Sequence, residues 1–235
     1  MVDPSIQENL QSIRQRMATA AERSGRRVEE ITLIGVSKTH PAEAIQGAFQ
    51  AGLRHFGENR VQEWEGKRRM LAELDATWHL IGHLQSNKAA KAAQLFHCVD
   101  SVDNLGLAQR LHRAQSETAG DRKLRVLIEV HLGGETSKSG VGEEQLPAMA
   151  EQVTGLQRLE LAGLMCIPPY LEDPERVRPY FARLRELREE LQSRVGLKLP
   201  VLSMGMSHDF EAAILEGATE VRVGTALFGT RSVAH

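Results

Sequence analysis

The stretch Ile31-Thr32-Leu33-Ile34-Gly35-Val36-Ser37-Lys38-Thr39-His40-Pro41 predicts a buried strand that turns directly into a helix. Its apolar run, residues 31–36, is too short and too rich in β-branched side chains to be a helix. Pro41 suits the first turn of a following helix. Lys38 is therefore expected at the carboxyl end of a strand, in a strand-to-helix turn.

Short apolar runs alternate with helical segments from this stretch onward, and we count eight candidate strands. Apolar strands joined by helices indicate a parallel sheet, and eight strand–helix units favour a closed barrel. We predict an α/β fold, a single (β/α)8 TIM barrel over 31–229, with a doubly wound sheet as the alternative. An extra amphipathic helix over 5–24 precedes it. The predicted strands are 31–36, 55–57, 78–81, 97–101, 124–130, 159–165, 200–202 and 220–223, and the predicted helices between them are 41–51, 59–74, 87–95, 103–118, 143–154, 174–195 and 207–216.

Composition excludes several classes of protein. The 235 residues carry a net charge of −2 with both signs interspersed, and only 4% are aromatic, so nucleic acid is not an expected partner. No linker divides the chain, and we predict one domain over 1–235. Without a signal-peptide pattern or a membrane-spanning run, a cytoplasmic protein with no membrane partner is expected. Cys98 and Cys166 are too far apart in sequence for a zinc or redox motif, and we expect buried free thiols.

Polar residues follow several of the predicted strands, at the end of the barrel where active sites form. Phosphate is expected at the loops after the last two strands, because helix starts there offer free backbone N–H groups. Ser207 is predicted as the N-cap of the helix after the seventh strand. Gly205 and Gly224 would let the backbone approach the phosphate, and Thr225 offers a second hydroxyl.

Two side chains indicate which phosphorylated compound the expected phosphate site would bind. A lysine at the position of Lys38 can form a Schiff base with a bound aldehyde when burial or a neighbouring cation keeps its amine neutral. Arg222, at the end of the last strand, can donate to a pyridine nitrogen, and this would leave the ring a weak electron sink. Pairing of Arg222 with Glu220 or another surface acid is the alternative. Together the two residues predict pyridoxal phosphate as the cofactor.

The sequence resembles the pyridoxal phosphate homeostasis proteins in six stretches. They are GVSK (35–38), FGENRVQE (56–63), WHLIGHLQSNK (78–88), SKSG (137–140), GLMCIP (163–168) and LSMGMSHDFEAAILEGATEVRVGTALFG (202–229). The resemblance implies a fold-type III barrel similar to the N-terminal domain of alanine racemase, without the racemase's second domain. It also implies the cofactor-binding residues: Lys38 for the Schiff base, Asn59 near the ring hydroxyl, Arg222 at the pyridine nitrogen, and Ser207, Gly224 and Thr225 at the phosphate.

Four other residues receive a different interpretation. His79 and His83 have ligand spacing but straddle a strand end, so no metal site is predicted. Lys138 is a competing amine, although a solvated lysine is the simpler reading. His208 stands where the family often has an acid, and we expect it to be solvated.

The expected function is to hold pyridoxal phosphate as a Schiff base on Lys38 and to buffer or deliver it, with apo forms of pyridoxal phosphate enzymes as partners. A monomer is expected, and no catalytic residue is assigned. An amino-acid racemase is the first alternative; it needs a second base opposite the lysine, and neither Tyr170 nor Tyr180 is an obvious one. A barrel forming a Schiff base with a phosphorylated sugar is the second, and it leaves Arg222 without a clear role.

Overall fold

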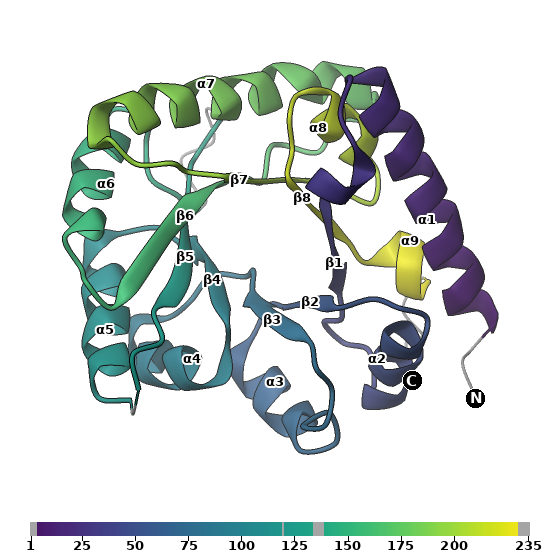
Figure 1. The fold of residues 1–235 in the computed structure, drawn as a ribbon, viewed down its shortest axis with the longest axis horizontal. Helices are drawn as coiled ribbons and strands as arrows, with labels where there is room; N and C mark the ends of the chain where they lie inside the picture. The colour runs from purple at the N-terminus through teal and green to yellow at the C-terminus, as the bar shows by residue number, and fades with distance from the viewer. Residues whose placement is uncertain (1–3, 119, 134–138, 230–235) are drawn as a thin grey trace.

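The structure is a computed structural model that describes residues 4–118, 120–133 and 139–229. Its strands form a closed parallel barrel in chain order, as predicted, and the doubly wound sheet is excluded. Figure 1 shows the strands in a ring with the helices around them. The strands are β1 (Thr32–Val36), β2 (His55–Glu58), β3 (Thr77–Leu80), β4 (Cys98–Val102), β5 (Leu124–Glu129), β6 (Leu159–Met165), β7 (Val201–Met206) and β8 (Glu220–Val223).

The helices follow the predicted order and are mostly shorter than the sequence suggested. For example, α3 spans eight residues where 59–74 was predicted. They are α1 (Pro4–Arg23), α2 (Ala42–Gln50), α3 (Val61–Arg68), α4 (Ala89–Leu95), α5 (Leu105–Ser116), α6 (Leu146–Thr154), α7 (Arg178–Val195), α8 (Phe210–Leu215) and α9 (Thr225–Phe228), with short 3-10 turns at Val28–Glu30, Ser86–Lys88 and Pro174–Val177.

Side chains alternate between the two faces of each strand, and this alternation places the site. On β1, Leu33 belongs to the apolar core between barrel and helices. A Cβ on Gly35 would meet the side chains of Leu53 and Leu227, so this position also faces the helices. Ile34 is fully buried and faces the other way, into the barrel.

The region after β7 differs from the prediction. Residues 203–206 were placed in a loop, but β7 runs to Met206 with a register shift against β8. The following helix begins at Phe210 with Asp209 before it, so the prediction that Ser207 is its N-cap was wrong. A glycine in this position suggested a loop, but Gly205 lies within the strand. It has φ +91°, and a Cβ there would lie 2.6 Å from Ala213 Cβ. This glycine makes room for α8, which no periodicity signals.

Helix α1 packs against α8 and α9 on one side of the barrel. Its Arg16 makes a two-bond ion pair with Glu211 of α8, at 2.7 and 2.8 Å. Asn9 donates to the Leu227 carbonyl of α9 at 3.1 Å. In Figure 1, α1 runs beside α8 and α9. The extra helix therefore holds the two elements that follow β7 and β8. Within the described ranges, no helix is both long and apolar enough to cross a bilayer.

Candidate functional site

Lys38 lies just beyond the carboxyl end of β1 and is half-buried. The β1–β2 ladder continues past the strand, because the Ser37 N–H donates to the Gly57 carbonyl at 3.0 Å. Ser37 is buried and its hydroxyl faces the helix layer. If the alternation of β1 continues past Ser37, the Lys38 side chain is directed to the same side as Ile34, into the barrel. The structure thus places Lys38 in the turn after β1, as predicted, and its role in binding stays a prediction.

A polar cluster lies behind Lys38, on the outer face of the barrel. Lys67 of α3 donates to Glu58 at 3.1 Å, to Glu63 at 2.7 Å and to the Ser37 carbonyl at 2.9 Å. Burial raises the pKa of Glu58 despite the nearby ammonium. Burial acts in the same direction on Glu63, but its bonds from Lys67 and the Thr39 N–H hold the pKa of that carboxyl below its usual value. Sequence reasoning missed this cluster.

The loops after β7 and β8 meet at the mouth, as predicted for a phosphate site. The Ser207 hydroxyl oxygen accepts hydrogen bonds from the N–H groups of Gly224, at 3.2 Å, and Ala226, at 3.4 Å. Ser207 thus caps the first turn of α9 rather than that of α8. Gly224 also packs against β1, because a Cβ there would lie 3.3 Å from Val36 Cβ. Thr225 is exposed beside them.

Arg222 points into the barrel and is only 3% exposed. It donates to the Ser203 hydroxyl at 2.7 Å and to the Cys166 carbonyl at 2.8 Å. The alternative pairing with Glu220 is wrong, because Glu220 pairs with Arg125 of β5. A buried guanidinium held by two neutral acceptors keeps its charge without a carboxylate in direct contact.

Asn59 follows β2 and lies against the next loop. A Cβ on Gly82 would be 2.5 Å from the Asn59 carbonyl oxygen, so only glycine allows this approach. Asn59 lines a cavity of about 420 Å³ together with Arg60, His83 and Lys88. His83 has a 58% exposed side chain and pairs with Asp103, at 3.0 Å.

Deeper in the barrel, His79 of β3 is fully buried between two partners. Its Nδ1 is 2.9 Å from Asp100 Oδ2, and its Nε2 is 3.1 Å from His55 Nδ1. Burial alone would lower the pKa of His79, but the ion pair with Asp100 raises it well above its ordinary value. Burial and the charge of His79 lower the pKa of His55 to about 4. A protonated His79 can therefore donate to both neighbours.

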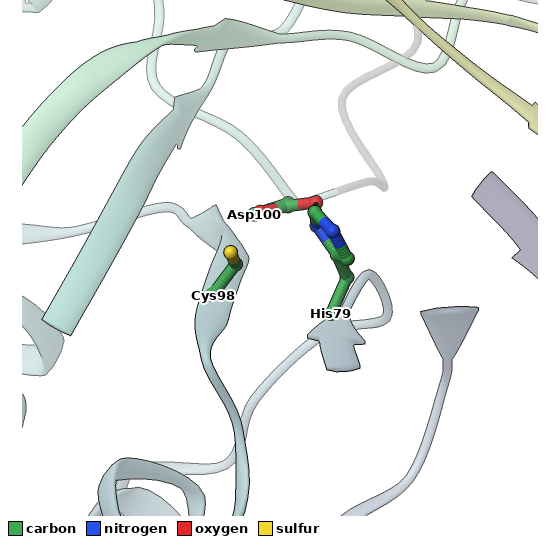
Figure 2. Close-up of side chains that lie close together, drawn as sticks. All are labelled: His79, Cys98 and Asp100. Carbon is green, nitrogen blue, oxygen red and sulfur yellow. Dashed lines mark hydrogen bonds and ion pairs between the residues drawn. The ribbon is translucent and has the colours of Figure 1, made fainter. Parts of the chain in front are cut away.

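Figure 2 shows His79, Asp100 and Cys98 close together, with the imidazole directed at the carboxylate. One ligand atom from each lies within 4.8 Å of the others, which suits a metal. However, both nitrogens of His79 are engaged, and a metal ligand must offer a lone pair. The cluster is better explained as a buried charge network, and the absence of a metal site stays a prediction.

The remaining residues divide into those the structure places and those it does not. Lys138 lies outside the described residues. His208 is exposed, but its Nε2 is 3.1 and 3.0 Å from the carbonyls of Leu171 and Glu172, so it is not merely solvated. Glu129, 5% exposed at the end of β5, accepts from the Ser139 hydroxyl at 2.9 Å. The sequence analysis did not single out Glu129, although an acidic residue at the end of an apolar strand could have indicated it.

Comparison with known proteins fits this fold and site. The alanine racemase N-terminal domain family matches residues 6–232. An alanine racemase of Clostridium difficile superimposes with a TM-score of 0.75 over 98% of this chain and 58% of its own, and at 15% identity it shows the fold alone. The class is therefore the racemase-type barrel.

Closer relatives narrow the class. The pyridoxal phosphate homeostasis protein of Pseudomonas aeruginosa is 49% identical, over 97% of this chain and 96% of its own. PipY of Synechococcus elongatus PCC7942, solved with PLP bound, is 42% identical with a TM-score of 0.85, over 95% of this chain and all of its own. The chain belongs to the pyridoxal phosphate homeostasis protein family, as its motifs predicted.

Proposed function

We propose that this protein binds pyridoxal phosphate, holds it by a Schiff base on Lys38 and takes part in its homeostasis by buffering or delivering it. The observation that supports this proposal most is the set of hydrogen bonds from the Gly224 and Ala226 N–H groups to the Ser207 hydroxyl, which we call the Ser207–Gly224 junction. It lies beside β1, the strand that leads to Lys38. The name of the Pseudomonas aeruginosa relative and the PLP-bound PipY support the same assignment.

The donor set fits this cofactor. The Ser207 hydroxyl accepts two bonds, and its own hydrogen has no acceptor among the described residues, which suits an anion such as phosphate. Thr225 adds an exposed hydroxyl at the same turn. Arg222 supplies a permanent cationic donor inside the mouth, where a pyridine nitrogen can accept. Asn59 is assigned to the ring hydroxyl by the family resemblance.

The chemistry that the cofactor supplies is an aldehyde that a lysine amine can attack. This chain's residues would bind and orient it: the Ser207 and Thr225 hydroxyls would donate to the phosphate at the turn that Gly224 forms, and Lys38 would anchor the aldehyde. A donor that cannot lose its proton at the pyridine nitrogen disfavours carbanion chemistry. We therefore propose retention and release rather than turnover, with no catalytic residue.

The setting proposed for this function is the cytoplasm. Cys98 and Cys166 are both buried free thiols, and burial raises the pKa of Cys166 to about 12, so this thiol stays protonated and unreactive. Free thiols suit a reducing compartment. A single-domain monomer with apo forms of pyridoxal phosphate enzymes as recipients completes the proposal. Light scattering that gives twice the chain mass would contradict the monomer.

The first test is the visible absorption spectrum of the purified protein with and without added pyridoxal phosphate, followed by borohydride reduction and peptide mapping. We expect a yellow imine band and an adduct on Lys38, both lost in Lys38→Ala. Lys88→Ala is the matched control. It removes a lysine that lines the same cavity as Asn59 and leaves Lys38 unchanged. An adduct confined to Lys138, or no band, would refute the assignment.

A second assay separates this function from the racemase alternative. Purified holoprotein should interconvert D- and L-amino acids no faster than Lys38→Ala. Tyr170 is 73% exposed and contacts the His208 ring, which leaves it outside the buried part of the mouth. Cofactor-dependent turnover that disappears with Lys38 would establish the racemase instead.

A further inference from the structure

We propose that Glu58, Glu63 and Lys67 form a clamp that positions Lys38 from behind and sets how fast the cofactor is released. The inference rests on the proposed function and deepens it, because it names the residues that regulate retention at the same site. None of the three needs to touch the cofactor. They act on the backbone of the lysine.

The clamp anchors both peptide groups that flank the Lys38 Cα. The carbonyl of Ser37, on one side, accepts from the Lys67 ammonium at 2.9 Å. The N–H of Thr39, on the other side, donates to the Glu63 carboxylate. The same ammonium donates to Glu63 at 2.7 Å, so one ion pair ties the two anchors together.

Two of the three clamp residues are largely buried, and the Glu63 side chain is 24% exposed. The side chain of Glu58 is 0% exposed and that of Lys67 is 13% exposed. Glu58 accepts from the Ser37 hydroxyl at 2.7 Å and from Lys67 at 3.1 Å, and its second oxygen has no partner among the described residues. Removing one member of such a cluster leaves the others uncompensated in a dry environment. The remaining side chains and the Lys38 backbone must then rearrange.

Backbone strain at Thr39 shows what the clamp holds in place. Thr39 has φ +67°, and it is the only non-glycine with a positive φ within the described ranges. A β-branched residue rarely adopts this conformation, and it persists only where the surroundings impose it. The bond from Thr39 to Glu63 is such a constraint. Thr39 lies in a turn that the His40 N–H closes on the Ser37 carbonyl at 3.2 Å, directly after the lysine.

The clamp lies on the side of β1 opposite to the Lys38 side chain. Ser37 faces outward to Glu58 and Lys67, and by alternation Lys38 faces inward. A small shift of the Lys38 backbone would therefore move its amine relative to the fixed Ser207–Gly224 junction. Release requires water to hydrolyse the imine to the aldehyde and the free Lys38 amine. Misplacement of a reacting group by about 1 Å can cost on the order of a hundredfold in rate, here the rate at which the amine recaptures the aldehyde, so net release becomes faster.

The test compares two pairs of variants. One pair lies in the clamp, and the other is an exposed ion pair between Glu65 of α3 and Lys91 of α4. Lys67→Met and Glu63→Ala break the clamp, whereas Lys91→Met and Glu65→Ala break a pair of equal type on the outer face. The control pair, Lys91 and Glu65, is joined at 2.6 Å with side chains 47% and 45% exposed. Each holoprotein is mixed with an excess of an apo-enzyme that captures pyridoxal phosphate, well below its Tm, and loss of the imine band is followed.

We expect the cofactor to leave Lys67→Met and Glu63→Ala at least about tenfold faster than the wild type, and the two controls to match the wild type within about twofold. Lys67→Arg keeps the positive charge and should restore part of the slow release seen in the wild type. A merely structural role would lower the Tm without changing release at low temperature. Wild-type release rates in both clamp variants would overturn the inference.

Amide hydrogen exchange of the apoprotein tests the clamp without the cofactor. The Thr39 amide should exchange faster in Glu63→Ala than in the wild type or in Glu65→Ala. Equal exchange would overturn the clamp even if the imine forms. Conversely, a wild type with no adduct on Lys38 but with a Thr39 amide protected through Glu63 would refute the proposed function and leave the clamp as a backbone anchor.

Discussion

His55 should make the folded protein sensitive to mild acid, and His55→Gln should remove that sensitivity. The pKa of His55 falls from the ordinary 6.5 to about 4, because burial and the charge of His79 oppose its protonation. The unfolded chain takes up this proton near its ordinary pKa, whereas the folded chain does not. The stability that neutral His55 provides is therefore complete above about pH 6.5 and is lost as the pH falls toward 4.

The size follows from the shift. At about 1.4 kcal/mol per unit, a shift from 6.5 to 4 corresponds to about 3 kcal/mol, and partial exposure of the ring reduces this to about 2 kcal/mol. His79 does not add to this acid loss. Its pKa is raised in the fold, so its contribution is complete below the ordinary histidine pKa and is lost only as the pH rises through the folded value.

Glutamine suits the test because its amide oxygen can still accept from His79, but it does not titrate. The free energy of unfolding is measured in urea at pH 4 to 7, following fluorescence of the buried Trp64 and Trp78. Between pH 7 and 4 the wild type should lose about 2 kcal/mol more than His55→Gln. His83→Gln, at an exposed histidine, should track the wild type. Parallel curves for wild type and His55→Gln would refute the reasoning.

Three further predictions concern close packing and the buried network. Gly163→Ala should unfold the barrel or lower its free energy of unfolding by about 3 kcal/mol or more, because the new Cβ would lie 1.9 Å from the Val201 carbonyl oxygen. In the control Gly142→Ala, the new Cβ meets nothing within 4 Å, and this variant should melt like the wild type. Gly82→Ala should weaken pyridoxal phosphate binding, measured by titration of the imine band, because its Cβ would displace Asn59; unchanged affinity would separate Asn59 from the cofactor. Elemental analysis after dialysis against Zn²⁺ should find no bound equivalent, since both nitrogens of His79 are engaged; one equivalent lost in His79→Gln would contradict this.

The sequence predicted the barrel because each strand is a short apolar run and each connection has a helical period. The alternation along β1 also predicts that Lys38 is directed to the inside of the barrel. What the sequence could not supply was long-range geometry. The Ser207 hydroxyl was assigned to the wrong helix, because its partners lie 17 and 19 residues further along the chain. The role of Gly205 depends on Phe210 and Ala213, which only the folded chain brings near it.

The charged residues were harder to predict because each depends on its partner. Glu58 follows the predicted strand 55–57, so the sequence placed it in a loop. Only its contacts with Lys67 and Ser37 show that it faces the helices. Arg222 was compatible with a surface ion pair until its burial and its two neutral acceptors were known. A strand pattern gives the face of a side chain, but the choice of partner requires the register of neighbouring strands.

The inward-facing charges of the barrel are arranged so that only the upper ones remain for a ligand. Glu220 and Arg125 pair with each other, and His79 pairs with Asp100, so these deeper charges neutralise each other within the barrel. Two residues further along β8, Arg222 has only neutral acceptors. A permanent cation in that position stabilises an electron-rich heteroaromatic or anionic ligand, whereas a carboxylate there would favour a protonated pyridine. Arg222 is therefore a buried cation in the upper part of the barrel, close enough to the carboxyls of Glu129 and Asp209 to lower their pKa against the effect of burial. We propose that this permanent donor favours reversible retention of pyridoxal phosphate over its activation.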